Sequence, residues 1–518
     1  MSAAKILWVD DEIESLQSQK LFLENKGYEV QTLTNGFDAV EFVKDNPIDV
    51  VLLDETMPGI TGLETLSRIK EVNGSIPVVL ITKNETENLM DDAIGSQITD
   101  YLIKPVNPNQ VLLSLKKIID NRRLVAEKTT TAYQQQFRNL FMALNSNPDY
   151  NGWMDIYKKL VYWELEMEKS DSPEMQEVLS SQKQEANTEF FKFVSKNYAK
   201  WVNPKSAESP IMSHNLFQFK VLPHVEKGTS TFFILIDNLR FDQWKTIQPL
   251  FAENFRILEE ETFYSILPTA TQYSRNAICA GMLPVDIEKS FPVQWKNDDD
   301  EGGKNLYEDD FFKAQLKRLK KDNLKYSYTK VVNHHDGQQL VNNIHNLLNN
   351  DINIIIYNFV DMLSHARTEM EVLKELASDE ISYRSITKSW FEHSPLNQAL
   401  KKIADKKIKL ILATDHGSVR VKTPYKVIGD KQTTTNLRYK HGRNLNYDAK
   451  EVLAFKDPRE AGLPVPTVNS SFIFAKEDGY LCYPNNYNHY VNYYRNTFQH
   501  GGVSLEEMIV PVVKMESK

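Results

Sequence analysis

The sequence has almost no cysteine, no long apolar run and no excess of positive charge. Its two cysteines, Cys279 and Cys482, exclude a disulfide framework or a cysteine-rich zinc module. No stretch approaches the roughly 18 consecutive apolar residues that a membrane-spanning helix needs, and the first ten residues hold no apolar segment long enough for a signal peptide. The net charge of −9 argues against a broad nucleic-acid-binding face. We therefore expect a cytoplasmic protein without membrane insertion and without direct DNA binding.

The composition leaves room for several folded domains. The chain has 518 residues, of which 41% are hydrophobic, and domains of roughly 100–200 residues are usual. Residues 1–120 alternate short apolar runs with helical patterns, which is typical of a doubly wound parallel sheet in an α/β domain. The five expected strands are residues 6–9, 30–33, 50–53, 78–82 and 101–103.

Residues 121–205 have helical periodicity instead, with apolar residues recurring at helix spacing in separate stretches. A single long connector helix is one interpretation. Pro148, Pro173 and the loop-like residues 145–152 favour a small helical bundle that joins two larger domains.

Residues 206–518 return to strand–helix alternation and are expected to form a larger α/β domain. Three apolar runs there each end on an aspartate, as in strands buried on both faces of a parallel sheet. Ligands of such sheets bind beyond the carboxyl ends of the strands. With nearby histidines, these carboxylates predict a metal site at one sheet edge. The runs are residues 231–236, 352–360 and 408–414, the aspartates are Asp237, Asp361 and Asp415, and the histidines are His365, His416 and His500.

Polar side chains also follow the strands predicted in residues 1–120. Asp10, Asp11 and Asp54 form a set of carboxylates that suits Mg²⁺, a cation that prefers oxygen ligands. Thr82 and Lys104 offer a hydroxyl and an ammonium group to a phosphoryl group at the same edge. The alternative is an ordinary flavodoxin-like domain with scattered polar residues at its loop edge, but five separate positions agree with one mechanism.

These motifs resemble the response-regulator receiver domain, whose fold is a flavodoxin-like five-stranded sheet. The resemblance implies a sensor histidine kinase as phosphodonor and homodimerisation on phosphorylation. Lys83 departs from the family, in which a small residue is common at that position. The implied roles are Asp54 as phosphoacceptor, Asp10, Asp11, Asp54 and the backbone of Thr56 as Mg²⁺ ligands, and Thr82, Tyr101 and Lys104 as the switch.

A nucleophile for the larger domain is available in residues 267–284. Pro268 and the following threonines indicate a strand exit and a helix start, and Gly281 indicates the helix end. Thr271 then lies at the positive end of a helix, where phosphate binds. Taken alone, Thr271 is better explained as a helix N-cap. Aspartate and histidine ligands without cysteine suit Zn²⁺, with Mn²⁺ as the second choice.

Residues 206–518 resemble the alkaline phosphatase superfamily, and most closely its PglZ branch. The resemblance rests on these aspartates and histidines in order, and on the tail that begins at His500-Gly501-Gly502. It implies a metal-dependent hydrolase in which one Zn²⁺ ion activates Thr271 and the other stabilises the leaving oxygen. Sulfatase relatives use cysteine or serine at this position, so threonine disfavours sulfatase chemistry. The implied ligands are Asp361, His365 and His500 for one ion, and Asp237, Thr271, Asp415 and His416 for the other.

The sequence gives less information about the substrate than about the metal ligands. No arginine can be assigned to the role that binds phosphomonoesters, whereas Asn238 is placed to contact a phosphate oxygen; Arg240 and Arg275 are equally interpretable as structural. The basic residues 438–444 either grip a nucleotide's phosphates or form a solvated surface, and the acidic residues 298–303 are expected to form a solvated loop. We expect a nucleotide-derived phosphodiester as substrate.

The two halves together resemble the PorX-type regulators of Bacteroidetes. That resemblance implies a role in type IX secretion and contact with an extracytoplasmic-function sigma factor or a secretion-motor component. One hypothesis is that phosphorylation of Asp54 controls phosphodiester hydrolysis. The alternative is a docking protein switched by phosphorylation, in which catalysis is incidental.

Overall fold

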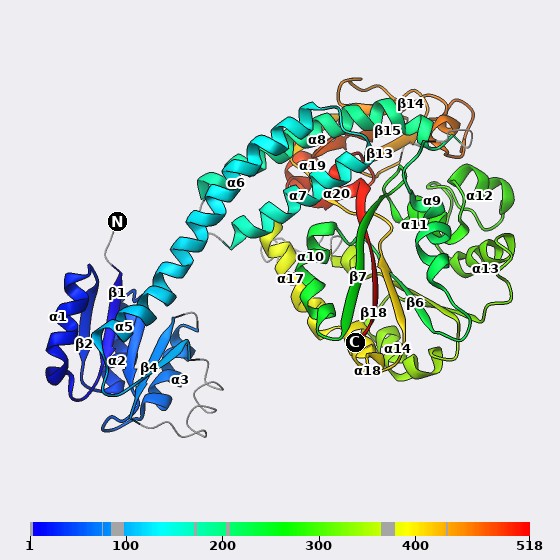
Figure 1. Cartoon of the computed structure of the whole chain (residues 1–518). Coiled ribbons are helices and arrows are strands. Elements are labelled where there is room, and N and C mark those ends of the chain that lie inside the picture. Colours follow the sequence, from blue (N-terminus) through cyan, green and yellow to red (C-terminus); the bar gives the residue numbers. More distant parts are fainter. Residues whose placement is uncertain are drawn as a thin grey trace. The chain divides into compact units, whose positions relative to one another are not determined.

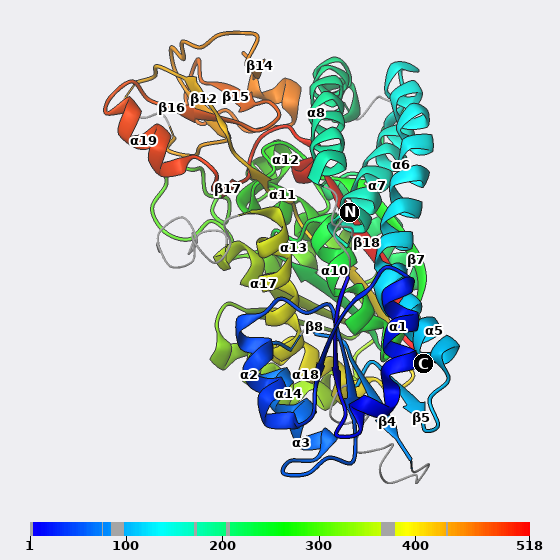
Figure 2. The same ribbon diagram turned by 90° about the vertical axis from the view of Figure 1, so that its left-hand side faces the viewer.

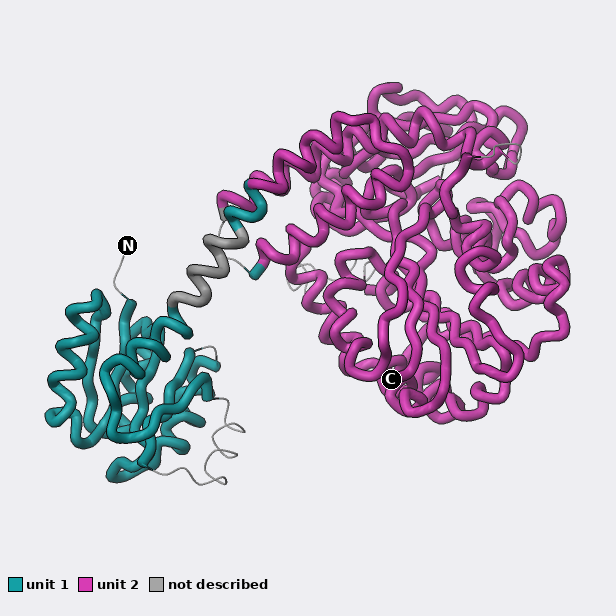
Figure 3. Tube along the Cα trace, viewed as in Figure 1, with its two compact units in different colours: residues 1–134, 169–172 teal, residues 135–168, 173–518 magenta. Residues whose placement is uncertain are grey.

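The computed structural model describes residues 4–74, 76–83, 98–169, 173–203, 208–363, 379–430 and 434–518. The chain divides into two compact units, which Figure 3 distinguishes by colour. The first unit contains residues 1–134 and 169–172, and the second contains residues 135–168 and 173–518. The boundary falls inside helix α6 (Asn121–Asn145), and each unit is described by itself below.

The first unit contains a five-stranded parallel sheet with the order β2-β1-β3-β4-β5. All residues of the central strands β3 and β4 are buried, which explains their uninterrupted apolar sequences. Because β1 and β3 are neighbours, the residues that follow them meet at one edge of the sheet. This confirms the predicted doubly wound sheet and its five strands. The bounds are β1 (Lys5–Val9), β2 (Glu29–Leu33), β3 (Val50–Asp54), β4 (Val78–Thr82), β5 (Asp100–Ile103), α1 (Gln17–Asn25), α2 (Gly36–Asp45), α3 (Gly62–Val72) and α5 (Pro108–Leu115).

Residues 121–201 form separate helices rather than one continuous connector. After α6 come α7 (Tyr150–Glu168) and α8 (Pro173–Trp201). Both pack on the body of the second unit through aromatic rings. The Tyr157 ring of α7 lies 6.2 Å from that of Phe241, and the Phe190 ring of α8 stacks 6.3 Å from that of Tyr264. These two helices therefore share a core with the C-terminal part of the chain.

The second unit is built on a six-stranded mixed sheet with the order β7-β18-β10-β6-β9-β8. Strands β10, β6, β9 and β8 are parallel, and β18 runs antiparallel to both of its neighbours. Figure 1 shows helices α10 and α17 on one side of this sheet and α11 and α13 on the other. The strands are β6 (Thr231–Ile236), β7 (Phe255–Tyr264), β8 (Tyr326–Val331), β9 (Ile352–Tyr357), β10 (Lys409–Ala413) and β18 (Ile509–Ser517).

Several helices and smaller strands complete the second unit. Figures 1 and 2 agree in placing β14 and β15 together at one end of it. The helices are α9 (Ser213–Leu216), α10 (Phe241–Ala252), α11 (Thr271–Ala280), α12 (Pro284–Ser290), α13 (Glu308–Arg318), α14 (His334–Leu347), α17 (Glu380–His393), α18 (Pro395–Ile403), α19 (Tyr487–Tyr494) and α20 (Leu505–Met508). The smaller strands are β11 (Val419–Arg420), β12 (Thr423–Lys426), β13 (Tyr439–Gly442), β14 (Val452–Phe455), β15 (Ser471–Ala475), β16 (Gly479–Cys482) and β17 (Phe498–Gln499).

One predicted strand end is wrong. Strand β9 ends at Tyr357, whereas the sequence predicted a strand through residue 360. Residues 359–363 are helical, so Asp361 lies in a helical turn rather than directly after a strand. An uninterrupted apolar run cannot by itself distinguish a buried strand from a buried helical turn.

Buried ion pairs connect helices α7 and α8 to the rest of the second unit. The guanidinium of Arg384 (α17), which is 2% exposed, lies 2.8 Å from Glu164, 2.9 Å from Glu168 and 3.0 Å from Asp242. Lys183 of α8 pairs with Glu164 at 2.9 Å and with Glu506 at 3.1 Å. Removing one partner from such a group leaves an uncompensated buried charge, which is strongly destabilising.

This network predicts a specific loss of stability in acid. Burial alone raises the pKa of Glu164, but the charges of Lys183 and Arg384 outweigh burial and lower it from 4.5 to about 2. A depressed carboxyl pKa contributes stability above pH 4.5, and that contribution is lost as the pH falls towards 2. We expect Glu164→Gln to reduce the free energy of unfolding at pH 7 and to flatten its decline over this window. Denaturant unfolding at a series of pH values measures both effects, and parallel curves for variant and parent would contradict the assignment.

Candidate metal centres

The predicted acidic cluster of the first unit is present at the ends of β1 and β3. Ligand oxygens of Asp10, Asp11 and Asp54 all lie within 4.8 Å of one another. The Nζ atom of Lys104 lies 2.9 Å from Asp10 Oδ2 and 2.8 Å from Asp54 Oδ1. Burial raises the pKa of Asp54 and Asp10 adds to the rise, while the hydrogen bond from Lys104 opposes it. Three convergent carboxylates fit a hard divalent cation such as Mg²⁺.

The other predicted residues of this unit surround the cluster in different environments. Thr82, at the end of β4, is buried, while Tyr101 on β5 is 42% exposed. Thr56 lies in the turn after β3, and its hydroxyl donates to Glu55 at 2.8 Å. Lys83 points to Glu12 at 3.9 Å, and both side chains are exposed. The structure thus pairs Lys104 with the acidic cluster, places Thr82 at the end of β4 next to β3, and leaves the Tyr101 ring in contact with solvent.

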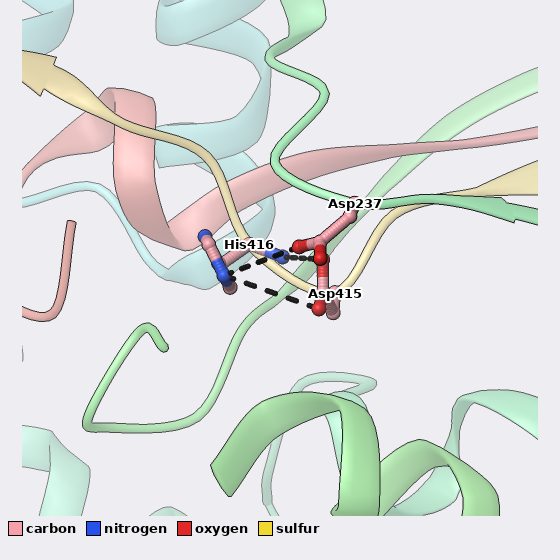
Figure 4. Close-up of side chains that lie close together, drawn as sticks. All are labelled: Asp237, Asp415 and His416. Carbon is pink, nitrogen blue, oxygen red and sulfur yellow. Dashed lines mark hydrogen bonds and ion pairs between the residues drawn. The ribbon is translucent and has the colours of Figure 1, made fainter. Parts of the chain in front are cut away.

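The second unit brings Asp237, Asp415 and His416 together at the carboxyl ends of β6 and β10. All three are buried, and their ligand atoms lie within 4.8 Å of one another. Figure 4 shows the three side chains pointing towards one another. The backbone N–H groups of Asn238 and His416 donate to Asp415 Oδ1 at 3.2 and 3.1 Å. Because β6 and β10 are neighbouring strands, this convergence follows directly from the sheet order.

Thr271 joins this cluster as the first residue of α11. The N-cap position belongs to Ala270, so the interpretation of Thr271 as an N-cap is wrong. Its hydroxyl donates to Asp237 Oδ1 at 3.2 Å and lies 3.0 Å from His416 Nε2. The other ring nitrogen of His416 lies 3.1 Å from the carbonyl oxygen of Gly417, which can only accept. His416 Nδ1 therefore carries the proton, and Nε2 presents a lone pair towards Thr271 and the two aspartates.

The second predicted ligand set lies beside the first. His500 Nε2 is 3.5 Å from Asp361 Oδ1, and His500 Nδ1 is 3.2 Å from the carbonyl oxygen of Thr269. The rings of His416 and His500 are stacked with their centroids 4.3 Å apart. The remaining predicted ligand, His365, lies outside the described residues. Six of the seven predicted ligands thus gather at one edge of the sheet.

The chemistry of this cluster fits a divalent metal. Burial and the neighbouring Asp237 raise the pKa of Asp415 well above its ordinary value, because two carboxylates share a fully buried site. Within the described part of the chain, the buried Asp415 Oδ2 atom has no hydrogen-bond partner. A cation at this point would stabilise both carboxylates. Carboxylate oxygens with a neutral imidazole nitrogen are donors that Zn²⁺ and Mn²⁺ accept.

Arg275, Glu308 and Asn358 form a supporting group that the sequence did not assign. Arg275 Nη1 donates to Asp237 Oδ2 at 2.7 Å and to Asn358 Oδ1 at 2.9 Å, while Nε donates to Glu308 at 2.6 Å. Arg275 stands four residues after Thr271 on α11, and residues i and i+4 share a helix face. That spacing is the signal that could have found it. Arg240, in contrast, pairs with Asp242 and Glu380 and is structural.

Asn238 has a backbone role that the sequence did not predict. It is fully buried and adopts a left-handed conformation with φ of 62°, which Asn tolerates better than most residues. Its N–H group donates to Asp415, so the turn after β6 orients a ligand. A direct contact between its side chain and phosphate stays a prediction.

Of residues 438–444, only Arg443 and Asn444 are exposed, so the interpretation as a solvated surface is wrong for the rest of the segment. Arg438, Lys440 and His441 are buried, because residues 439–442 form strand β13 inside a small sheet. Arg438 pairs with Glu507 at 2.6 Å, and Lys440 donates to backbone carbonyl groups. His441 Nε2 lies 3.1 Å from Asp298, so the predicted solvated acidic loop is anchored at its first residue. Burial here depends on strand pairing across long sequence separations, which local composition does not reveal.

Three regions of the chain match family models. Residues 6–116 match the response regulator receiver domain, residues 123–202 match the PorX response regulator linker domain, and residues 216–515 match the BREX system PglZ alkaline phosphatase-like domain. The predicted fold class, with a flavodoxin-like sheet, helices and a larger α/β domain, is confirmed. Among the residues that the structure describes, each helix is too short or too polar to cross a lipid bilayer.

Curated relatives match through the N-terminal region. The transcriptional regulatory protein ZraR of Klebsiella oxytoca is 36% identical over 132 residues, which are 26% of this chain and 30% of ZraR. The transcriptional regulatory protein SrrA of Staphylococcus aureus is 29% identical over 115 residues, 22% of this chain and 47% of SrrA. The chain thus spans less than half the length of these relatives. The crystal structure of a CheY-like receiver domain protein from Methanospirillum hungatei is 26% identical, with a TM-score of 0.23 over 23% of this chain and 96% of that chain.

Proposed function

We propose that the chain is a response regulator whose output is metal-dependent phosphodiester hydrolysis. It belongs to the family with a BREX system PglZ alkaline phosphatase-like domain, in the PorX-type architecture of receiver, linker and PglZ domains. The observation that carries the proposal is the Thr271 hydroxyl, held between Asp237 and His416 at one end of a helix. Nucleophilic phosphoryl transfer requires a hydroxyl group placed among groups that can activate it, and here the Thr271 hydroxyl lies among predicted metal ligands.

The residues of the chain define the steps. Thr271 Oγ1 attacks phosphorus and its hydroxyl proton passes to solvent; an O–P bond forms to Thr271, and the bond from phosphorus to the leaving oxygen breaks, so that the leaving group departs into solvent. The positive end of α11 attracts the phosphate. Asp237 and His416 contact the hydroxyl, and Arg275 orients Asp237 through the other carboxylate oxygen. Water then cleaves the phosphothreonine ester. Two divalent ions would lower the pKa of the hydroxyl and neutralise charge on the phosphoryl group. The residues that would hold these ions are Asp237, Asp415, His416, Asp361, His500 and, as predicted, His365.

The proposed preference for a phosphodiester rests on the hydrogen bonds and burial of the Arg275 guanidinium group. Its guanidinium is already engaged by Asp237, Glu308 and Asn358, and the residue is 2% exposed. It is therefore not available to neutralise the additional negative charge of a phosphomonoester. A diester lacks that charge. We propose a nucleotide-derived diester, Zn²⁺ as the metal, and a histidine kinase as the phosphodonor for Asp54. Homodimerisation follows from the receiver resemblance, and links to type IX secretion, a sigma factor or a secretion motor follow from the PorX-type resemblance; all of these stay proposals.

A panel of nucleotide monoesters and diesters tests the proposal directly. The purified full chain is assayed with and without Zn²⁺, and with and without beryllofluoride as a mimic of the aspartyl phosphate. We expect turnover of diesters that requires the metal and changes with the mimic. Faster hydrolysis of monoesters than of diesters would overturn the substrate class, and equal turnover without metal would overturn the mechanism.

Phosphorylation of the first unit gives a separate prediction. We expect Asp54→Asn to abolish incorporation of phosphate from a small acyl-phosphate donor, because the amide cannot form the acyl phosphate that the buried carboxylate forms beside Lys104. Intact-mass measurement after incubation with donor and Mg²⁺ detects the adduct. Asp38→Asn, on an exposed side chain of α2, is the control and retains it. Phosphate uptake by Asp54→Asn at the parental level would assign the acceptor to another residue.

A further inference from the structure

An aromatic cavity of about 330 Å³ lies at the carboxyl ends of β8 and β9. Its walls include Val331 and Tyr357, the last residues of β8 and β9, Val332 and Phe359, which follow these strands, and Trp390 of α17. The rings of Phe359 and Trp390 are stacked, with centroids 4.0 Å apart and planes 4° from parallel, and the Tyr357 ring lies 5.6 Å from Trp390. Met362 also lines the cavity, together with Asn333, His334, His393, Ser394 and Pro395. We call this cavity the aromatic subsite.

The aromatic subsite and the metal centre share one short segment, residues 357–362. The carbonyl oxygen of Tyr357 accepts from the Asp237 N–H group at 2.9 Å. Asn358 Oδ1 accepts from Arg275 at 2.9 Å, and Asp361 lies 3.5 Å from His500. Five of the six positions in this segment thus touch the metal centre or line the cavity. The sheet order β10-β6-β9-β8 places the two sites side by side along one edge.

The helical turn at residues 359–363 explains how one segment serves both sites. Phe359 and Met362 are three residues apart, so they share a face of the turn and line the cavity. Asp361, two residues after Phe359, points to the opposite face, where His500 lies. The sequence predicted a strand here, but the segment is a helical turn. One face of the turn lines the cavity, and the other faces the metal centre.

We propose that the aromatic subsite binds the base of the nucleotide phosphodiester whose phosphate lies at Thr271. This inference rests on the proposed function and adds the specificity determinant. The lining is apolar and aromatic, which suits the face of a planar base and not a charged or flexible group. Met362 and Val332 are 45% and 41% exposed, so apolar surface remains at the mouth for a ligand to cover. The exposed imidazoles of His334 and His393 line the same cavity and offer hydrogen bonds to the edge of a base.

Two substrates with the same leaving group test the inference. One is the p-nitrophenyl ester of thymidine 5′-monophosphate, and the other is methyl p-nitrophenyl phosphate, which lacks the nucleoside. The full-length, Zn²⁺-loaded protein should prefer the nucleoside ester in kcat/KM. We expect Trp390→Leu and Met362→Gln each to reduce that preference about fivefold or more, mainly through a higher KM for the nucleoside ester. Leu258→Gln is the matched control, because Leu258 is 41% exposed on β7 at the opposite edge of the same sheet.

Met362→Gln keeps the test decisive if Trp390→Leu does not fold, since Met362 is an exposed rim residue. An unchanged preference in Met362→Gln, or an equal change in Leu258→Gln, would overturn the aromatic subsite. Calorimetric binding of thymidine 5′-monophosphate and of inorganic phosphate separates this outcome from failure of the proposed function. If neither ester is hydrolysed, the proposed function fails, while weaker nucleotide binding with intact phosphate binding in the variants would still support the subsite.

Discussion

Thr271→Val is expected to lower kcat for diester hydrolysis by on the order of 10³-fold or more. Valine replaces the hydroxyl with a methyl group of similar size, so α11 keeps its first residue while the oxygen held by Asp237 and His416 is lost. Steady-state kinetics on the nucleoside ester measure the loss. Thr271→Ser is the matched control, because it keeps the hydroxyl and should retain most of the activity.

The same variant separates catalysis from docking as the biological output. Zn²⁺ content by mass spectrometry should remain near the parental value in Thr271→Val, because five other ligands of the described chain stay in place. If the variant binds metal, lacks turnover and still supports regulation in cells, the docking alternative is correct and hydrolysis is incidental. Loss of regulation together with turnover would support the enzyme.

Arg384→Met is expected to reduce the free energy of unfolding by about 3–5 kcal/mol. The change removes the cation that lies between Glu164, Glu168 and Asp242, and it leaves those carboxylates facing one another in a mostly buried position. Methionine keeps the aliphatic bulk, so the effect reports on charge. Chemical denaturation followed by tryptophan fluorescence measures it, because the second unit contains buried tryptophans on α7 and α10.

Arg459→Met controls for the loss of an arginine as such. Arg459 pairs with Asp457 at 3.1 Å on the surface, with 67% of its side chain exposed, and exposed pairs contribute roughly 0–1 kcal/mol. In the double variant Arg384→Met with Glu164→Gln, part of the stability should return because one of the carboxylates that repel each other without Arg384 is removed. An Arg384→Met protein as stable as Arg459→Met would show that the network does not hold α7 and α8 in place.

The fold class and most of the candidate site could be predicted because the evidence is local. Strands β6, β9 and β10 are buried on both faces, so they must be apolar throughout, and each apolar run points to the polar residues that follow it. The neighbouring positions of β6 and β10 then bring Asp237, Asp415 and His416 together. The same reasoning places Asp10 and Asp54 at the ends of β1 and β3.

The errors in prediction occur where local patterns have two structural meanings. A run of apolar residues ending at Asp361 fits a strand, yet its last residues form a helical turn. The basic residues 438–441 fit a surface loop, yet pairing of β13 with β15, more than 30 residues later in the chain, buries them. In both cases a partner distant in sequence decides the outcome.

The sequence by itself determined the α/β class and the carboxylates that follow the buried strands, because each is encoded in a short strand–turn pattern. The roles of the aspartates and histidines as metal ligands and of Thr271 as the nucleophile stay predictions. The tertiary structure alone decided which buried charges pair: Arg275 with Asp237 and Glu308, and Arg384 with the carboxylates of α7 and α10. It also decided that residues 357–362 serve the metal centre on one face and the aromatic subsite on the other. The physical reason is that burial follows from local composition, whereas the partner of a buried charge or ring is set by which elements meet in three dimensions.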